Sequence, residues 1–342
     1  VIMESTYGNR NHKNKGDQIK ILADIFVETA ARGGTIVIPA FAVGRAQDLI
    51  YEFDDLMETD AYYAEKLKDM KMYIDSPMAV AATEVFKRNV QVFDDAYKEK
   101  LLGGDDPLDF INLFFTKSAE ESKALNQSDE PKIIISASGM CEAGRIRHHL
   151  KHHLWRGKDS ICFVGYQAEG TLGREILGGA KTVRLFGEDV HVNAHIYDLQ
   201  GFSAHADHDG LMDWVRGFQM KPSAFFLVHG ELQAKKDLAR DIAEATEIEP
   251  TVVERISEFE LMKSGTTSIA AAMSDILDEE DISGLHTRIA GVRESLGALL
   301  DKVDAAAGSG IDAASLAGLN NRLLAIEKDT MGLASEIADR KK

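Results

Sequence analysis

Short apolar runs that each end in a turn and lead into a helical pattern constrain the fold of this chain more than any other feature. Thr35–Pro39 and Lys132–Ser136 are nearly continuous apolar runs, as found in strands that are buried on both faces. Turns at Gly44 and Gly139 follow them, and a helical pattern follows each turn. Strands that alternate with helices in this way predict an α/β fold with a largely parallel sheet. The same patterns predict further strands over Val190–Ile196 and Ala224–His229 and a helix over Leu232–Thr246.

The ends of these predicted strands are candidate binding positions, because ligands of parallel sheets lie beyond the carboxyl ends of the strands. Arg45, Ser138 and Gly139 occupy two such strand-to-helix junctions. Backbone N–H groups and a guanidinium at a junction of this kind suit an anion such as a phosphate. A turn glycine beside a salt-bridged Arg45 is the structural alternative, and Ser138 and Gly139 carry the same ambiguity.

Composition restricts the class of protein. An apolar fraction of 44% and a charged fraction of 28% are ordinary for a globular chain. No apolar stretch approaches the roughly 20 residues that cross a bilayer, and no secretory leader opens the chain, so we expect a cytoplasmic protein without membrane contact. Cys141 and Cys162 are the only cysteines, too few for a disulfide framework or a four-thiolate zinc site. Any metal must therefore be bound by histidines and carboxylates.

The net charge of −17 opposes long-range attraction of a polyanion. A surface that binds nucleic acid must therefore be local. We expect one positive groove, formed by Arg45 together with basic residues of the loop at 10–15 and of a predicted helix, Ala143–His153. These basic residues are Arg10, Lys13, Lys15, Arg145, Arg147 and Lys151.

Three short clusters place ionisable residues where a strand ends or a loop begins. They are Met3–Gly8, Phe202–Asp207 and Leu227–Glu231. Rigid elements present side chains to a cleft at such positions. Each cluster alone favours a hydrogen-bonded structural histidine or a solvated carboxylate, but the three together are much more specific.

Together with four further motifs, these clusters resemble those of the β-CASP nucleases, a branch of the metallo-β-lactamase superfamily. The further motifs are Ile38–Gln47, Asp75–Ala79, Ser136–Met140 and Gly165–Leu172. The resemblance covers about residues 1–262. The context Phe202–Asp207 is closer to the bacterial and archaeal relatives of the pre-mRNA 3′-end cleavage endonuclease than to ribonuclease J.

The resemblance implies a role for each ionisable residue. His229 would be a ligand of one of two zinc ions, and a histidine at this position is typical of the RNA-processing branch. His205 would face the scissile phosphate and stabilise charge or protonate the leaving oxygen, while Glu4 would orient His205 and raise its pKa. Ser203, in the same motif as His205, is assigned to substrate binding along with Arg45.

The implied fold has three parts. Residues 1–8 and 201–262 would form the C-terminal part of a metallo-β-lactamase αββα sandwich, and residues 9–200 an inserted β-CASP α/β domain. Residues 263–342 would form a helical, coiled-coil-like tail, because apolar residues there alternate steps of four and three. Homodimerisation through this tail and a hairpin folded back on its own domain are equally open.

One motif of the family is absent from the sequence. A His-x-His-x-Asp-His run, with most of the zinc ligands, lies upstream of the Glu4 motif in the family, and nothing in residues 1–342 matches it. Because Val1 already lies inside an apolar run, we expect a preceding segment in the intact protein and no activity from these residues alone. The predicted function is a zinc-dependent ribonuclease acting on single-stranded RNA, for which endonucleolytic cleavage is favoured and exonucleolytic trimming in the same site stays open. A noncatalytic scaffold that binds RNA or a partner, and a metallo-hydrolase of a small phosphodiester or thioester, are the alternatives.

Four histidines lie on the predicted helix Ala143–His153 as two pairs with a spacing of four. They are His148, His149, His152 and His153. Such pairs can bind a metal, but no carboxylate or third ligand follows at helical spacing. We therefore expect a polar helix face beside RNA, and a surface position for His208.

Overall fold

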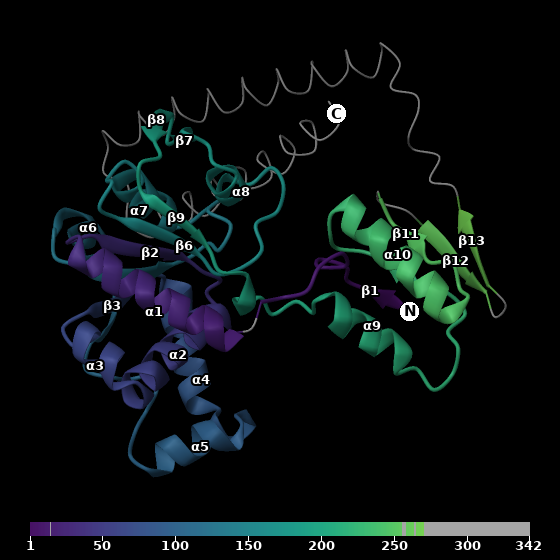
Figure 1. Ribbon diagram of the computed structural model, residues 1–342, viewed down its shortest axis with the longest axis horizontal. Coiled ribbons are helices and arrows are strands. Elements are labelled where there is room, and N and C mark those ends of the chain that lie inside the picture. Colours follow the sequence, from purple (N-terminus) through teal and green to yellow (C-terminus); the bar gives the residue numbers. More distant parts are fainter. Residues whose placement is uncertain (14, 255–257, 263–264, 270–342) are drawn as a thin grey trace, which may run out of the picture. The chain divides into compact units, whose positions relative to one another are not determined.

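The computed structural model describes residues 1–13, 15–254, 258–262 and 265–269 (Figure 1). It confirms an α/β fold with parallel sheets. The predicted helical tail and its homodimer contact lie outside the described residues, apart from five residues. These five, Gly265–Ile269, form strand β13 beside β12 (Glu258–Met262), so a strand stands where a helix was expected.

The larger of two parallel sheets in the described residues has six strands in the order β4-β3-β5-β2-β6-β9. Its central pair, β2 (Thr35–Pro39) and β5 (Lys132–Ser136), has the predicted bounds, and every residue of both strands is buried. Register pairs Ile36 with Ile133 and Ile38 with Ile135. The other strands are β3 (Lys71–Ile74), β4 (Leu113–Phe115), β6 (Ser160–Phe163) and β9 (His195–Asp198).

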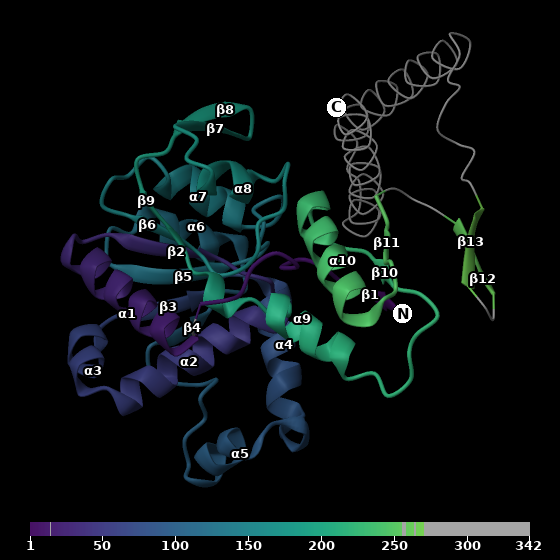
Figure 2. The ribbon, with the colours of Figure 1, turned by 45° about the vertical axis from the view of Figure 1, so that its right-hand side comes forward.

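Helices cover both faces of this sheet, as the continuous apolar runs require. Alternate residues of β2 point to opposite faces, so Ile36 and Ile38 join one apolar core and Val37 joins the other. Figures 1 and 2 show α1 and α2 on one face and α7 on the other. The helices are α1 (Lys15–Ala31), α2 (Arg45–Thr59), α3 (Ala61–Leu67), α4 (Pro77–Arg88), α5 (Asp95–Leu102), α6 (Ala119–Gln127), α7 (Ile146–His153) and α8 (Leu172–Leu177), with a 3₁₀ turn η1 (Val90–Val92).

One predicted strand is wrong, because part of it belongs to a short hairpin. The sequence predicts a single strand over Val190–Ile196, but β7 (Thr182–Leu185) pairs antiparallel with β8 (Glu188–His191), and β9 starts only at His195. Phe186 and Gly187 both have positive φ, 52° and 80°. Two such residues form the tight turn that suits a two-residue hairpin, so β8 folds back on β7 before the chain re-enters the sheet.

A second, three-stranded parallel sheet has the order β1-β10-β11 and consists of very short strands. They are β1 (Ile2–Met3), β10 (Phe226–Leu227) and β11 (Thr251–Val252). Met3, Leu227 and Leu238 lie in its core, which α9 (His208–Arg216) and α10 (Leu232–Thr246) complete. The predicted strand Ala224–His229 thus contributes only two residues to the sheet and leaves His229 in a loop.

The segment that contains the larger sheet starts and ends at two points that lie close together in space. The His208 N–H donates to the Arg10 carbonyl at 3.1 Å, and Asn11 Nδ2 donates to Asp209 Oδ2 at 2.7 Å. Gly8 lies directly against α10, since a Cβ there would be 2.5 Å from the Ala234 carbonyl oxygen. The structure therefore ties residues 10 and 208 together, and the proposed domain limits at residues 8/9 and 200/201 stay predictions.

None of the described helices combines the length and the apolar character needed to cross a bilayer.

Candidate catalytic and metal-binding site

Glu4 and His229 meet because they follow neighbouring parallel strands, β1 and β10, whose carboxyl ends lie at the same edge of the sheet. The Ser5 N–H donates to the His229 carbonyl at 2.8 Å, and Ser5 Oγ donates to the Val228 carbonyl at 2.9 Å. His229 has a φ of 48°, in the left-handed region, and Gly230 follows with a φ of 147°. The close approach of Ser5 explains this glycine, because a Cβ there would lie 2.6 Å from the Ser5 carbonyl oxygen.

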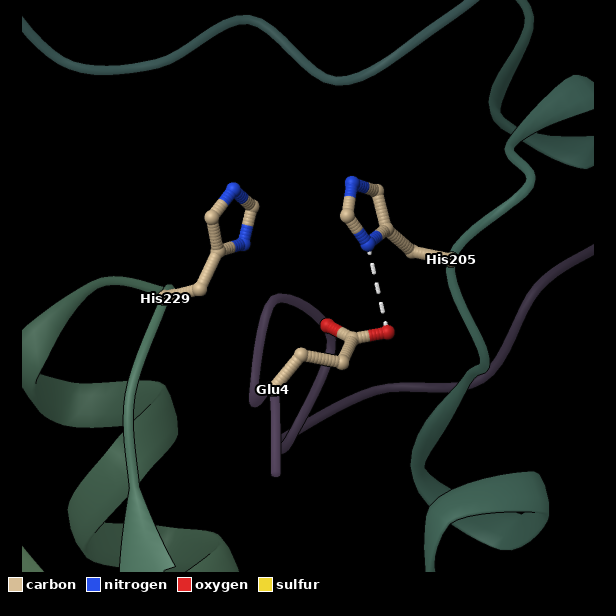
Figure 3. A group of neighbouring side chains, drawn as sticks. All are labelled: Glu4, His205 and His229. Atoms are coloured by element: carbon tan, nitrogen blue, oxygen red, sulfur yellow. Dashed lines mark ion pairs between the residues drawn. The ribbon is translucent and has the colours of Figure 1, made fainter. Parts of the chain in front are cut away.

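His205 reaches the same point from the loop that follows a 3₁₀ turn, η2 (Gln200–Phe202). His205 Nδ1 lies 3.2 Å from Glu4 Oε1, and the Ala206 N–H donates to the same oxygen at 3.2 Å (Figure 3). The imidazole rings of His205 and His229 stack with centroids 5.0 Å apart. One ligand atom from each of Glu4, His205 and His229 lies within 4.8 Å of the others. The structure thus brings the three residues of the predicted site together.

Thr6 connects the two rings, and the sequence analysis did not single it out. Its Oγ1 is 2.9 Å from His229 Nδ1 and 3.3 Å from His205 Nδ1, while its N–H donates to Glu4 Oε2 at 2.8 Å. Both Nδ1 atoms therefore have partners on the Glu4 side. Among the residues that the structure describes, neither Nε2 atom has a hydrogen-bond partner, and both Nε2 atoms point away from Glu4 (Figure 3).

The charge state of Glu4 follows from its contacts. Partial burial alone would raise the pKa of Glu4, but hydrogen bonds from Thr6 and the neighbouring His205 outweigh it, so the pKa lies below its usual value. Glu4 is therefore an ionised carboxylate at neutral pH and can only accept hydrogen bonds. His205 Nδ1 must then carry the proton that faces Glu4 Oε1.

The predicted substrate-binding residues are engaged within the protein. Arg45 forms a salt bridge with Asp48 at 2.6 Å, as its structural alternative predicted. Ser138 Oγ accepts from the Ala143 N–H at 3.3 Å, and the Gly139 carbonyl accepts from Gln167 Nε2 at 2.9 Å. These contacts give all three a structural role, and their contact with a substrate stays a prediction.

Ser203 lies in the loop that carries His205, where its Oγ accepts from the His205 N–H at 3.3 Å. It is the one predicted substrate-binding residue that directly contacts a member of the Glu4–His205–His229 group.

Three members of the expected positive groove, Arg45, Arg145 and Lys151, are paired with carboxylates, and RNA binding by the groove stays a prediction. Arg145 binds the buried Asp75 carboxylate at 2.6 Å, and Lys151 binds Glu188 at 2.7 Å. Carboxylates distant in the sequence neutralise these cations. Arg147 remains partly exposed, with its guanidinium 5.2 Å from the centre of the Phe186 ring.

The expectation of a polar helix face beside RNA is wrong for two of the four histidines of α7. His149 and His153 are fully buried, whereas His148 and His152 are exposed. His149 Nε2 lies 2.6 Å from Asp75 Oδ2, and His153 Nδ1 lies 2.6 Å from Asp159 Oδ2. His149 and His153 thus occupy the inner face of the helix.

His208, expected at the surface, is partly buried. Its Nε2 lies 2.9 Å from Asp241 Oδ2 on α10, so this histidine helps to hold α9 and α10 together.

Two tyrosines missed by the sequence analysis lie beside the Glu4 loop. Tyr166 donates to Glu231 Oε1 at 2.7 Å, and its ring meets the edge of the Tyr7 ring with centroids 5.8 Å apart. His12 Nε2 lies 2.8 Å from the His205 carbonyl oxygen. Tyr7 and Tyr166 lie within the motifs Met3–Gly8 and Gly165–Leu172, and no other feature of the sequence marks them.

Family models match most of the described chain. A model described as the β-CASP domain matches residues 46–176, and a model described as the Zn-dependent metallo-hydrolase RNA specificity domain matches residues 189–253.

Individual relatives show the same relationship. Ribonuclease TTHA0252 of Thermus thermophilus is 38% identical over 231 residues, which are 68% of this chain and 51% of that protein. The transcription termination factor FttA of Pyrococcus abyssi is 33% identical over 253 residues, 71% of this chain and 38% of that protein. FttA of Methanothermobacter thermautotrophicus is 34% identical over 260 residues, 73% of this chain and 39% of that protein. The matched region thus spans about half of these relatives' length or less.

Proposed function

Because the chain belongs to the β-CASP family of metallo-β-lactamase-fold ribonucleases, we propose that the intact protein is a zinc-dependent ribonuclease that cleaves single-stranded RNA endonucleolytically. The observation that carries the proposal is the convergence of Glu4, His205 and His229, with ligand atoms within 4.8 Å of one another. The grouping places one imidazole that suits zinc, that of His229, beside an imidazole–carboxylate pair that can move a proton.

His229 is the residue of this chain that would bind a zinc ion. Its Nδ1 is held by Thr6 Oγ1 at 2.9 Å. If Nδ1 donates to that hydroxyl, Nε2 keeps the lone pair that a metal requires. When bound, the zinc ions would supply Lewis-acid activation of water and neutralise charge on the phosphate. The remaining ligands would come from a segment outside residues 1–342.

His205 would act as the general acid. The ionised Glu4 accepts from Nδ1 of His205 and fixes the ring, which leaves Nε2 without a partner in the described residues and available to give a proton to the leaving oxygen. A noncatalytic scaffold would have no need for two stacked imidazoles with unpaired Nε2 atoms, which favours the enzyme over that alternative. Ser203, beside His205, would contact the RNA.

The test is RNA cleavage by the zinc-loaded full-length protein. His205→Ala and His229→Ala should each lower the rate constant by about 10²–10⁴-fold, the usual contribution of a positioned acid or base, or more where a metal is lost. His191→Ala, which removes an exposed histidine of β8, is the matched control and should cleave normally. Wild-type protein that binds single-stranded RNA but never cleaves it would support the scaffold instead.

A further inference from the structure

A second group of carboxylates lies on α2 and in the loop after α5. Asp54 and Glu58 are one turn apart on α2, and Asp105 follows α5. One carboxylate oxygen from each lies within 4.8 Å of the others. The backbone holds the loop in place, since the Asp105 N–H donates to the Lys100 carbonyl at 3.1 Å.

Asp54 is the unusual member, because it is a buried carboxylate with an unused acceptor. Its residue is only 6% exposed, and within the described part of the chain its Oδ2 has no hydrogen-bond partner. The buried Oδ2 atom of Asp105 also lacks a partner among the described residues. A buried acceptor without a partner destabilises the folded protein, and more so when it is charged. Two such atoms in one group indicate a missing donor or cation.

Lys100 is the cation beside the group, but it does not satisfy Asp54. Its Nζ lies 2.7 Å from Glu58 Oε2 and 3.0 Å from Asp55 Oδ1, yet 3.7 Å from Asp54 Oδ2. Asp54 Oδ2 therefore faces the group without a hydrogen bond. One ammonium stands against four carboxylates, so an excess of negative charge remains when all are ionised.

We propose that Asp54, Glu58 and Asp105 bind a divalent cation, calcium rather than magnesium, through one carboxylate oxygen each. Calcium binds oxygens at about 2.3–2.6 Å, so two oxygens that share one ion are at most about 5.2 Å apart. One oxygen from each of the three residues lies within 4.8 Å of the others, which is compatible with one shared ion. Calcium accepts several carboxylates in a flexible geometry, whereas magnesium is usually bound by one or two carboxylates and keeps several waters.

The cation would join α2 to the loop after α5, because Asp54 and Glu58 come from the helix and Asp105 from the loop.

Terbium luminescence tests the site in the zinc-loaded full-length protein. Terbium is the probe, and Tyr51 is a built-in antenna because its ring centre lies 5.5 Å from Lys100 Nζ. Calcium should displace the sensitised signal. Asp54→Asn and Asp105→Asn should each weaken calcium binding about tenfold or more, since affinity follows the number of charged ligands. Lys100→Met should strengthen calcium binding, because it removes the competing ammonium.

Asp95→Asn is the matched control, because it removes an exposed carboxylate from α5 itself and should leave the calcium affinity unchanged. Thermal unfolding of each variant checks that it is folded, and RNA cleavage should be unaffected. Wild-type affinity in both Asp54→Asn and Asp105→Asn, or a signal that calcium does not displace, would overturn the proposal. So would displacement by magnesium at lower concentration than by calcium. A failed nuclease assay would leave these readings intact, so the two proposals fail separately.

Discussion

Two groups of histidines and carboxylates in this chain contain the same residue types but differ in whether every ring nitrogen has a partner. In the buried group, His149 lies 2.6 Å from Asp75 Oδ2 through Nε2 and 2.8 Å from Asn126 Oδ1 through Nδ1, so both ring nitrogens have partners. In the group at the end of β1, His205 and His229 each use Nδ1 only, on the side of Glu4 and Thr6. A histidine with two partners is part of the core, whereas one with a spare nitrogen can bind a metal or transfer a proton.

The buried group is saturated on the carboxylate side as well. Asp75 receives hydrogen bonds or ion pairs from four side chains. They are Arg145, His149, Thr116 and Ser122. Although burial opposes ionisation, these partners, with His149 the strongest of them, hold the pKa of Asp75 well below its usual range. The group therefore stabilises the contact of α6 and α7 with the strand ends and leaves nothing for a ligand.

The two groups should differ most in how much they contribute to the free energy of unfolding. Asp75→Ala should lower the free energy of unfolding by about 3–5 kcal/mol, because it leaves a buried histidine and an arginine without their counter-charge. Glu4→Ala should cost less than about 1 kcal/mol, because Glu4 and His205 are partly exposed to water. Chemical denaturation of both variants measures the two values. Equal losses would mean that the two groups do not differ as described.

Neighbours on α7 sharpen the comparison within one helix. His149→Ala should cost about 2–4 kcal/mol, because the substitution opens a cavity and removes one buried hydrogen bond each from Asp75 and Asn126. His152→Ala removes an exposed ring and should stay within about 0.5 kcal/mol of wild type. The same denaturation experiment gives both numbers. A large loss at His152 would contradict the burial pattern of the helix.

Acid should act on the buried group in a defined pH window. Burial lowers the pKa of His153 despite the nearby Asp159. The unfolded chain therefore takes up a proton near pH 6.5 before the folded chain does, and stability is lost as pH falls from there through the folded pKa. The slope from this residue is at most about 1.4 kcal/mol per pH unit. His153→Gln should flatten the profile between pH 6.5 and 5, and an unchanged slope would assign it to other groups.

The sequence predicted those elements whose signal is local. β2 and β5 have the predicted bounds because their apolar runs are continuous, and α10 has the predicted bounds because its apolar face repeats at helical spacing. The sequence also indicated the grouping of Glu4, His205 and His229, because three clusters together are specific where one is not.

What the sequence did not predict depends on partners far along the chain. The pairing of Asp75 with Arg145 and His149 joins residues about 70 positions apart, and nothing local marks it. Thr6 escaped notice because its role exists only after β1 pairs with β10. The antiparallel pairing of β8 with β7, which takes β8 away from β9, depended on a tight turn at Phe186, a residue type that rarely has a positive φ.

The hydrogen bond from the His208 N–H to the Arg10 carbonyl bears on the history of the chain. A segment whose two ends meet can be gained, enlarged or exchanged without moving the points at which the chain enters and leaves it. The sheet β1-β10-β11 can therefore keep its strand pairing. Selection could therefore alter nearly two hundred residues of this segment almost independently of the short strands that carry Glu4 and His229. Related chains should accordingly tolerate transplants of the whole segment cut at these two residues better than cuts made anywhere within it.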